Sequence, residues 1–463
     1  MLAIPVICAA VLSAALTAGC GGGSSSVPLL GNTEVMLQLS SSGNDRLAKF
    51  NVDFQSITLT SQSGKTVNLL PAPQSGEFIH VNGTAEPLVT VSIPQDTYTS
   101  ATVTTTDDPG FACVSLLPTG GLQTSFFAAK PTASTVTLPN PIRITGTAMG
   151  LDLDLQVSQS AAFSDCNLAN HPTVAITPTY VLTPVVVASE PTSPHNGKLD
   201  GITGLITWTQ GTSQSYSVTL PDGQIVPFGF NSLTDFQVGG YGYNNIVDMD
   251  VALQEDGSLV ATRFNLWDTM AGDIVMGPLV FVSNAVPQLY MLPRQQQGFD
   301  IPSGGNFNFG SATFKVSSQF GNLSQLPFTA SFNAANMVPG QFAAITVPIG
   351  TSFATGYPAA STITLAPQTI NGTVQSVGTS GGFTTYTVVL APYDLFPALA
   401  VQAGQATLLA NPNTVVVYAD SNTQMLNSAS IASGSVMRFN GLVFNDNGTL
   451  RMDCGQVNDG VAE

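Results

Sequence analysis

The sequence predicts an all-β protein, with an N-terminal β-sandwich followed by two or three small OB-like β-barrel repeats. Three observations support this fold class. Short runs of alternating apolar and polar residues recur along the chain, and clusters of Gly, Pro and Asn separate them. No long segment has the 3.6-residue apolar period of a helix. Short alternating runs of this kind are typical of strands in sandwiches and barrels.

The composition is polar but mostly non-ionic. Hydrophobic residues make up 43% of the 463 residues, whereas charged residues make up only 8%, against roughly 25% in a typical soluble domain. A disordered chain would be poor in apolar residues and rich in net charge, which this chain is not. The formal net charge is −17, with only 11 Lys and Arg. Because charge-driven binding of nucleic acid needs basic patches, we expect no nucleic-acid partner.

An apolar run over residues 4–16 opens the chain, and Leu16-Thr17-Ala18-Gly19-Cys20 closes it. The run is too short to span a membrane as a stable helix, and small residues follow it, which predicts a signal peptide over residues 1–19. The Gly- and Ser-rich segment that continues to residue 30 predicts a flexible tether.

The small residues before Cys20 resemble the lipobox of bacterial lipoproteins, although Thr17 stands where that family usually has leucine. The resemblance implies that Cys20 becomes the acylated first residue of tether 20–30. It therefore implies export, anchoring in the membrane through a lipid and, because Gly21 is not Asp, a preference for the outer membrane.

Three further cysteines follow the tether. In the oxidising compartment expected for an exported protein, cysteines tend to pair. Cys113 and Cys166 fall in the same predicted domain, so we predict a disulfide between them, which leaves Cys454 over. No C-x-x-C spacing occurs, so we expect neither a zinc nor a redox site, and no cofactor is predicted.

Residues 31–189 predict one β-sandwich, from alternating runs such as 48–54 and 151–157. This stretch resembles an uncharacterised lipoprotein domain family, which has no activity to carry over. The polar, Pro-rich segment 190–197 predicts a linker to the next domain.

Beyond the linker the sequence repeats. Asp200-Gly201-Ile202-Thr203-Gly204-Leu205-Ile206 opens one unit, and Asn371-Gly372-Thr373-Val374-Gln375-Ser376-Val377 opens its counterpart. Both units close with an Asp-Gly or Asn-Gly dipeptide between two strand patterns, at residues 256–257 and 447–448, a strong hairpin signal. The units resemble an uncharacterised OB-like repeat family of exported bacterial proteins. The resemblance implies small closed barrels at 198–275 and 369–456, with a degenerate one at 276–368.

Candidate catalytic residues are few. Gly378-Thr379-Ser380-Gly381-Gly382 fits G-x-S-x-G, but a strand pattern follows it instead of a helix, which predicts a hairpin and no nucleophile. The three histidines, His80, His171 and His195, are widely spaced, which favours scattered surface or loop positions over a metal site or a catalytic base. Asp152 and Asp154 lie on one face of a strand. A solvated outer face is the simplest interpretation, although paired carboxylates can also bind calcium or act as acid and base.

Aromatic residues of the first barrel unit give the only candidate ligand surface. Tyr241 and Tyr243 lie in a Gly-rich loop, and Trp208 and Trp267 belong to the same unit. Exposed aromatic rings with neighbouring amides can stack on sugars, and OB-like barrels do bind oligosaccharides. The alternative is that the tryptophans fill the barrel core.

These observations favour a lipid-anchored, non-enzymatic protein of the cell envelope that binds or spaces something outside the cell, with a polysaccharide or an envelope protein as its possible partner. A carbohydrate-binding surface protein is the first alternative. A hydrolase with an unrecognised carboxylate site is the second.

Overall fold

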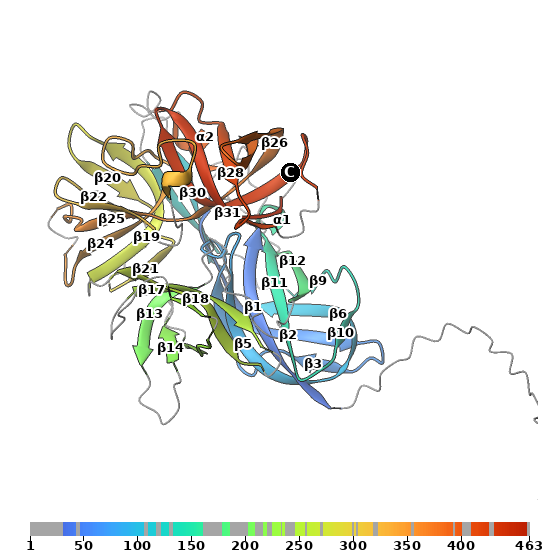
Figure 1. Cartoon of the computed structure of the whole chain (residues 1–463). Coiled ribbons are helices and arrows are strands. Elements are labelled where there is room, and N and C mark those ends of the chain that lie inside the picture. Colours follow the sequence, from blue (N-terminus) through green and yellow to red (C-terminus); the bar gives the residue numbers. More distant parts are fainter. Residues whose placement is uncertain are drawn as a thin grey trace, which may run out of the picture.

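The computed structural model confirms the all-β fold class (Figure 1). It describes residues 31–42, 47–105, 110–116, 122–128, 133–160, 178–185, 202–208, 216–219, 225–232, 234–236, 246–254, 257–268, 272–298, 301, 304–317, 323–352, 356–391, 394–400, 409–425 and 430–460. The predicted signal peptide, the tether and the linker 190–197 lie outside these residues, and the exact domain boundaries stay predictions.

The N-terminal domain is a sandwich of two sheets around one apolar core, in which Phe54, Phe78 and Tyr180 pack ring against ring. The first sheet has the order β12-β11-β1-β5, with β1 parallel to β11 and antiparallel to β5. Its strands are β1 (Asn32–Ser42), β5 (Ala85–Pro94), β11 (Ala148–Gln156) and β12 (Tyr180–Val185). The second sheet contains β2 (Leu47–Ser61), β3 (Thr66–Asn68), β4 (Gln74–Glu77), β6 (Asp96–Thr105), β7 (Gly110–Leu116), β8 (Leu122–Ala128), β9 (Ala133–Val136) and β10 (Ile142–Ile144).

Three units with one common topology follow the sandwich, and we call them barrels 1, 2 and 3. We number the five main strands of each unit in chain order. Across each sheet, neighbouring strands then follow the order third, second, first, fourth, fifth. A parallel contact between the third and fifth strands then closes the sheet, through Gly229 and Val260 in barrel 1 and through Asn308 and Ala359 in barrel 2. In barrel 3 the closing contact is a full ladder between β28 and β31. The middle unit, whose repeat pattern is degenerate, therefore has the same topology as its neighbours.

Each barrel contains six or seven strands, counting the short additional ones. Barrel 1 contains β13 (Ile202–Trp208), β14 (Tyr216–Thr219), β15 (Ile225–Phe228), β16 (Asp235–Phe236), β17 (Ile246–Leu253) and β18 (Leu259–Asp268). Barrel 2 contains β19 (Gly272–Ser283), β20 (Gln288–Met291), β21 (Gln295–Gln297), β22 (Gly305–Asn308), β23 (Thr313–Val316), β24 (Phe342–Pro348) and β25 (Thr362–Leu365). Barrel 3 contains β26 (Gln368–Ser380), β27 (Phe383–Leu390), β28 (Thr414–Ala419), β29 (Gln424–Met425), β30 (Val436–Asp446) and β31 (Thr449–Asp459).

Helical structure is limited, in the described residues, to α1 (Val157–Ser160), α2 (Leu395–Ala400) and the 3-10 turn η2 (Leu323–Gln325). None of the helices that the structure describes is long and apolar enough to cross a membrane.

Two predicted hairpins are confirmed. Asn447 and Gly448 connect β30 to β31 with φ values of 51° and 87°. Positive φ at both central residues is the requirement of the type I′ turn that Asn-Gly favours. Ser380 ends β26 and pairs with Phe383 at the start of β27, so the G-x-S-x-G segment is the tip of a hairpin and not a turn between a strand and a helix.

Barrels 2 and 3 share buried structure. Phe444 of barrel 3 belongs to the apolar core of barrel 2, and the Gln341 side chain donates a hydrogen bond to the backbone carbonyl of Val443 at 2.9 Å. Phe328, from the segment between β23 and β24, packs on Tyr418, and the Arg451 guanidinium lies over the Phe328 ring. These contacts fix the two barrels against each other through side chains, apart from their chain connection.

Candidate functional site

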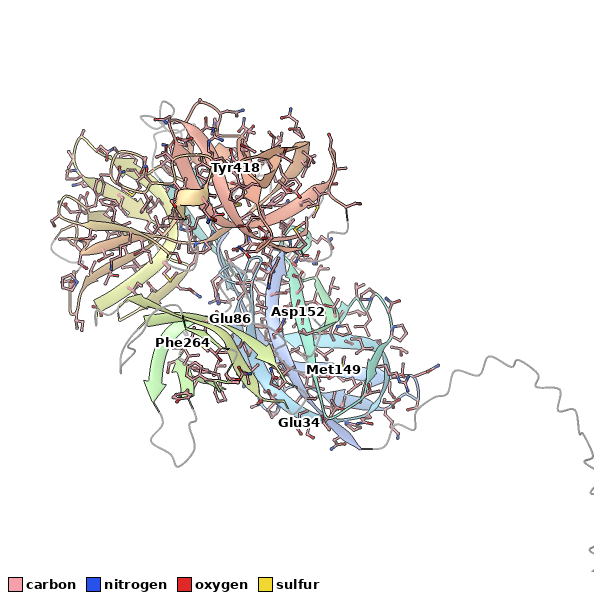
Figure 2. All side chains as sticks on the ribbon, viewed as in Figure 1. Glu34, Glu86, Met149, Asp152, Phe264 and Tyr418 are labelled. Atoms are coloured by element: carbon pink, nitrogen blue, oxygen red, sulfur yellow. The ribbon has the colours of Figure 1, made fainter. Side chains whose placement is uncertain are left out.

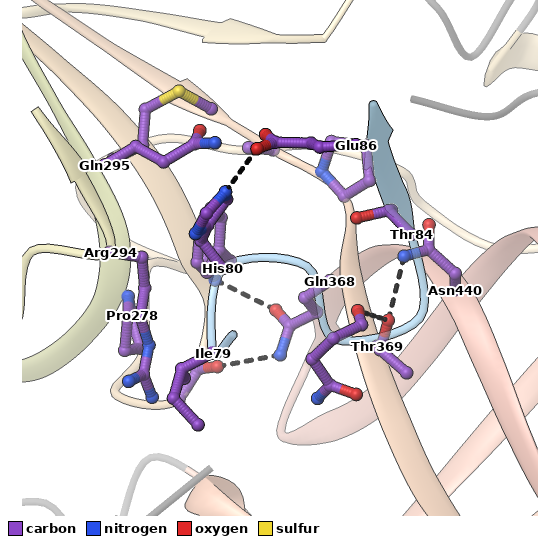
Figure 3. Close-up of a pocket in the computed structure, with 16 residues that line it drawn as sticks. Ile79, His80, Thr84, Glu86, Pro278, Arg294, Gln295, Gln368, Thr369 and Asn440 are labelled. Carbon is purple, nitrogen blue, oxygen red and sulfur yellow. Dashed lines mark hydrogen bonds and ion pairs between the residues drawn. The ribbon is translucent and has the colours of Figure 1, made fainter. Parts of the chain in front are cut away.

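Barrel 3 returns to the sandwich, although the two are the most distant domains along the chain. The Thr369 hydroxyl in β26 donates a hydrogen bond to the Asn82 carbonyl oxygen at 2.8 Å and accepts one from the Asn440 amide at 2.9 Å. The Arg438 guanidinium in β30 donates to the carbonyl oxygen of Ser41 at 3.2 Å. These contacts define the junction, at which the segment between β4 and β5 meets barrels 2 and 3 (Figure 3).

His80 lies at this junction between two glutamates. Its Nδ1 is 2.8 Å from Glu77 Oε2, and its Nε2 is 2.8 Å from Glu86 Oε2. Burial alone lowers the pKa of His80, but the charges and hydrogen bonds of Glu86 and Glu77 outweigh burial and raise its pKa well above the ordinary value. Burial likewise opposes ionisation of Glu77, yet His80 and two backbone N–H donors hold its pKa below the ordinary value. The raised pKa of His80 and the engagement of both its ring nitrogens suit a structural cation better than a proton-transfer group.

This arrangement corrects the sequence-based view of His80. The residue lies in a turn, as expected, but its side chain is only 12% exposed. The missed signal was the placement of Glu77, His80 and Glu86 within one short stretch of a chain that has few charged residues. His171 and His195 lie outside the described residues.

A small polar pocket of about 100 Å³ lies beside His80 and Glu86. Barrel 2 contributes the buried Arg294 to its wall, and barrel 3 contributes Gln368 and Asn440. The Asn440 Oδ1 atom is buried without a hydrogen-bond partner. A cavity of this volume has room for water, which would satisfy such an acceptor.

Asp152 and Asp154 lie side by side on β11, as the alternation predicted. Ser40 Oγ lies 2.7 Å from Asp152 Oδ2 and 3.1 Å from Asp154 Oδ2. Burial, with the charge of Asp154, raises the pKa of Asp152 to about 6, although hydrogen bonds and Arg438 of barrel 3 act in the opposite direction. Burial raises the pKa of Asp154 as well. The simple expectation of a solvated outer face is therefore wrong, because both side chains are half-buried and the charge of Arg438 from barrel 3 acts on them. Figure 2 shows the position of Asp152 in the sandwich.

A larger groove separates the sandwich from barrel 1, and we call it the β5–β15 groove. Its volume is about 560 Å³, within the range of ligand sites in proteins. Consecutive residues from three strand segments line it: 87–90 of β5, 225–229 in and after β15, and 257–260 at the start of β18. Tyr216 of β14 and Met36 of β1 complete the wall. In Figure 1, β18 passes beside β5 at this place.

Both β5 and β15 lie at the ends of their sheets in the described structure. β5 pairs with β1 and β15 pairs with β14, and the parallel closure of barrel 1 reaches only Gly229, just beyond β15. The groove is thus bordered by two strands that each end a sheet of the described structure. Behind it, Tyr216 packs on Phe228 and Phe230 at ring-centroid distances of 6.0 and 4.7 Å, and Phe264 fills the barrel interior (Figure 2).

The structure describes the backbone of only two of the four aromatic residues that were predicted to form a ligand surface. Trp208 is the last residue of β13, and its backbone pairs with Tyr216, which lines the β5–β15 groove. Trp208 is therefore one strand away from the groove. Trp267 lies in β18 at a register shift, between Leu266 and Asp268, which pair with successive residues of β17. Tyr241 and Tyr243 lie outside the described residues, and their proposed role stays a prediction.

The cysteine predictions also remain untested. Cys113 pairs with Leu47 and Ser125 in the backbone ladders of the second sandwich sheet. Cys166 and Cys20 lie outside the described residues. Cys454 is a buried thiol in β31 outside any disulfide, and its Sγ lies 3.2 Å from the Gln456 carbonyl oxygen.

Comparison with known proteins gives little beyond the fold class. No family model matches the sequence, and no curated protein matches it. A solved structure of Drosophila Unr, designated CSD456, matches at a TM-score of 0.13 and 12% identity, covering 57% of this chain and 98% of its own. A multidomain protein with nucleic acid binding domains from Streptococcus pneumoniae matches at a TM-score of 0.12 and 11% identity, covering 56% and 73%. Similarities at this level support no argument about activity.

The expectation that nucleic acid is no partner is withdrawn, because the second of these structures is of a protein with nucleic acid binding domains. At a TM-score of 0.12 the match assigns no such binding to this chain.

Proposed function

We propose that this chain is an exported, lipid-anchored protein of the cell envelope that acts by binding and not by catalysis. The observation that carries the binding role is the return of barrel 3 to the sandwich, through Thr369 and Asn82 and through Arg438 and Ser41. A spacer gains reach by arranging its domains in a row. Domains that fold back gain no reach, but they create surfaces between themselves, where ligand sites preferentially occur.

The proposed anchor is the lipid on Cys20, and the outer membrane is the favoured location. Its support is the lipobox-like segment together with the position at which the tether enters the fold. The described structure begins at Gly31, directly before β1, and β1 is paired on both sides by β5 and β11. A lipid anchor attached through this tether would hold the sandwich near the membrane. Through the junction it would hold barrels 2 and 3 there as well.

Membrane fractionation tests the anchor. Cys20→Ala should move the protein from the membrane fraction to the soluble fraction, whereas Ser26→Ala, in the same tether, should leave it with the membranes. Metabolic labelling with a fatty acid should mark the parent chain and the Ser26→Ala variant only. Retention of the Cys20→Ala variant in the membrane fraction would contradict the proposal.

A second candidate, binding of carbohydrate, is favoured by one specific observation. None of the described residues that line the β5–β15 groove is charged, and in barrel 1 the groove is built on the second and third strands and the start of the fifth. In OB-folds the second and third strands and the loop between the fourth and fifth bind oligonucleotides and oligosaccharides. The Asp152 and Asp154 pair gives less support to a hydrolase, because it lies against Arg438 of barrel 3.

A further inference from the structure

We infer that the β5–β15 groove binds an uncharged oligosaccharide in an extended conformation. This inference deepens the binding role proposed above by assigning it a site and a ligand class. The site differs from the Gly-rich tyrosine loop, because both of its walls are strands and one wall belongs to the sandwich.

The described lining residues of the groove favour an uncharged ligand. The lining residues are apolar or carry neutral polar groups, such as Thr90, Tyr216 and Ser258. Because none of the described lining residues is charged, they offer no ion pair to an ionic ligand, and the groove that they form favours a neutral one.

The edges of the groove also argue against an added peptide strand. Pro87 lies in β5 at the start of the lining segment 87–90, and Pro227 lies in β15 at the middle of the lining segment 225–229. Proline has no N–H to give to a ladder, and proteins use proline on edge strands to prevent pairing with other chains. A continuous ladder with a peptide would therefore be broken on both sides.

A sugar chain needs no continuous ladder. Its hydroxyl groups can donate and accept single hydrogen bonds wherever a polar side chain offers a partner. Its ring faces carry C–H groups that pack on apolar and aromatic surface. Tyr216 and the two prolines provide such surface, and the exposed Thr90 and Ser258 side chains add hydroxyl groups. The groove combines an apolar wall with a few polar groups, which is the usual composition of a ligand site.

Isothermal titration calorimetry with neutral hexasaccharides of several linkages (gluco-, xylo- and manno-oligosaccharides) tests the inference on the folded chain from residue 31. Two substitutions on one strand provide the comparison. Thr90 and Ser92 are both exposed on β5 and two residues apart, but only Thr90 lines the groove. Thr90→Trp fills the groove and should weaken binding at least tenfold, whereas Ser92→Trp should bind as the parent chain does.

Three results would overturn the inference: no hexasaccharide binds at millimolar concentration, Thr90→Trp and Ser92→Trp bind equally, or single-stranded oligonucleotides or an extended apolar peptide bind the groove more tightly than any sugar. A chain that fails these tests but still depends on Cys20 for membrane attachment would keep the proposed envelope location and lose only the ligand. Equal thermal unfolding midpoints of the two Trp variants exclude misfolding as the cause of lost binding.

Discussion

Thr369 donates its hydroxyl hydrogen to the backbone carbonyl of Asn82, which lies 287 residues earlier in the chain. The hydroxyl is buried and also accepts a hydrogen bond from Asn440, so one side chain links the sandwich to two strands of barrel 3. A buried polar group that lost one of these partners would destabilise the fold by roughly 1–3 kcal/mol. The contact between the first and last domains is therefore a buried, hydrogen-bonded interface that contributes to the stability of the fold.

Because Thr369 lies close to Gly83, a methyl group added at Gly83 should destabilise the fold. Gly83 has φ +77°, and an added Cβ would lie 2.3 Å from Thr369 Oγ1. Gly64 has φ +82°, and nothing lies within 4 Å of an added Cβ. Alanine in this left-handed region costs about 1–2 kcal/mol at either site. Gly83→Ala should lose a further 1–3 kcal/mol, roughly the cost of overpacking.

Urea unfolding followed by circular dichroism measures the difference between the two variants. Gly83→Ala should unfold at a clearly lower urea concentration than Gly64→Ala. Equal midpoints would mean that barrel 3 does not press on the sandwich at this glycine.

His80 should titrate far from its ordinary pKa. Because its pKa is raised in the folded chain, its stabilising contribution is complete below about pH 6.5, the unfolded value, and is lost as the pH rises through the folded pKa. Glu77 has a lowered pKa, so its contribution is present above about pH 4.5 and is lost as the pH falls. The junction is therefore most stable in the window between these limits.

Nuclear magnetic resonance of the imidazole ring gives the pKa of His80 directly. The chain has only three histidines, so variants that replace each one with Gln assign the signals. A titration midpoint of His80 near pH 6.5 would contradict the contacts of its two ring nitrogens with Glu77 and Glu86.

The raised pKa of Asp152 predicts that this residue lowers the free energy of unfolding as the pH rises, whereas a carboxylate with a lowered pKa would raise it. Its pKa is raised from 3.8 to about 6, so its stabilising contribution is present below about pH 3.8 and is lost as the pH rises through about 6. Between these values the free energy of unfolding of the parent chain, relative to Asp152→Asn, should fall by up to about 1 kcal/mol per pH unit.

Urea unfolding of both chains at pH 4.5 and pH 7 checks this prediction, with Asp53→Asn as a control at an acidic residue elsewhere in the sandwich. A parent chain that gains stability over Asp152→Asn on going to pH 7 would contradict the raised pKa.

Barrel 3 offers a test of close strand packing within β26. A Cβ on Gly372 would lie 2.3 Å from the Val389 carbonyl oxygen, whereas a Cβ on Gly378 would meet nothing closer than the Thr385 hydroxyl at 3.2 Å. Backbone cannot yield as a flexible side chain can, so Gly372→Ala should destabilise barrel 3 by several times the effect of Gly378→Ala, on the order of 3 kcal/mol. Thermal unfolding by calorimetry compares the two, and a similar loss in both variants would refute the proposed crowding.

The sequence predicted those features that depend on neighbouring residues. Period-2 alternation identified the strands, and the dipeptide Asn447-Gly448 identified a hairpin, because both signals act over a few residues. The matching openings at Gly201 and Gly372 indicated the repeat. The closed-barrel form of the units and the degenerate middle unit followed from a fold resemblance, whereas the parallel contact that closes each barrel was not predicted.

The candidate sites were harder to predict, because they depend on contacts between distant segments. Nothing in the residues around Asn82 indicates that Thr369 will contact them, and a strand pattern at Asp152 does not show that Arg438 will approach. The β5–β15 groove arises where β5 of the sandwich faces β15 and β18 of barrel 1. His80 was the exception, since Glu77 and Glu86 are close to it in sequence and could have been recognised as its partners.

Small-angle X-ray scattering of residues 31–463 tests most directly whether the domains fold back into one block. A compact chain of this length has a radius of gyration of roughly 23 Å, and we expect a value within a few ångströms of that, unchanged by moderate salt. Four separate domains in a row would give roughly 35 Å or more. A value in that range would contradict the contact between barrel 3 and the sandwich, and with it the basis for a binding role over a spacer role.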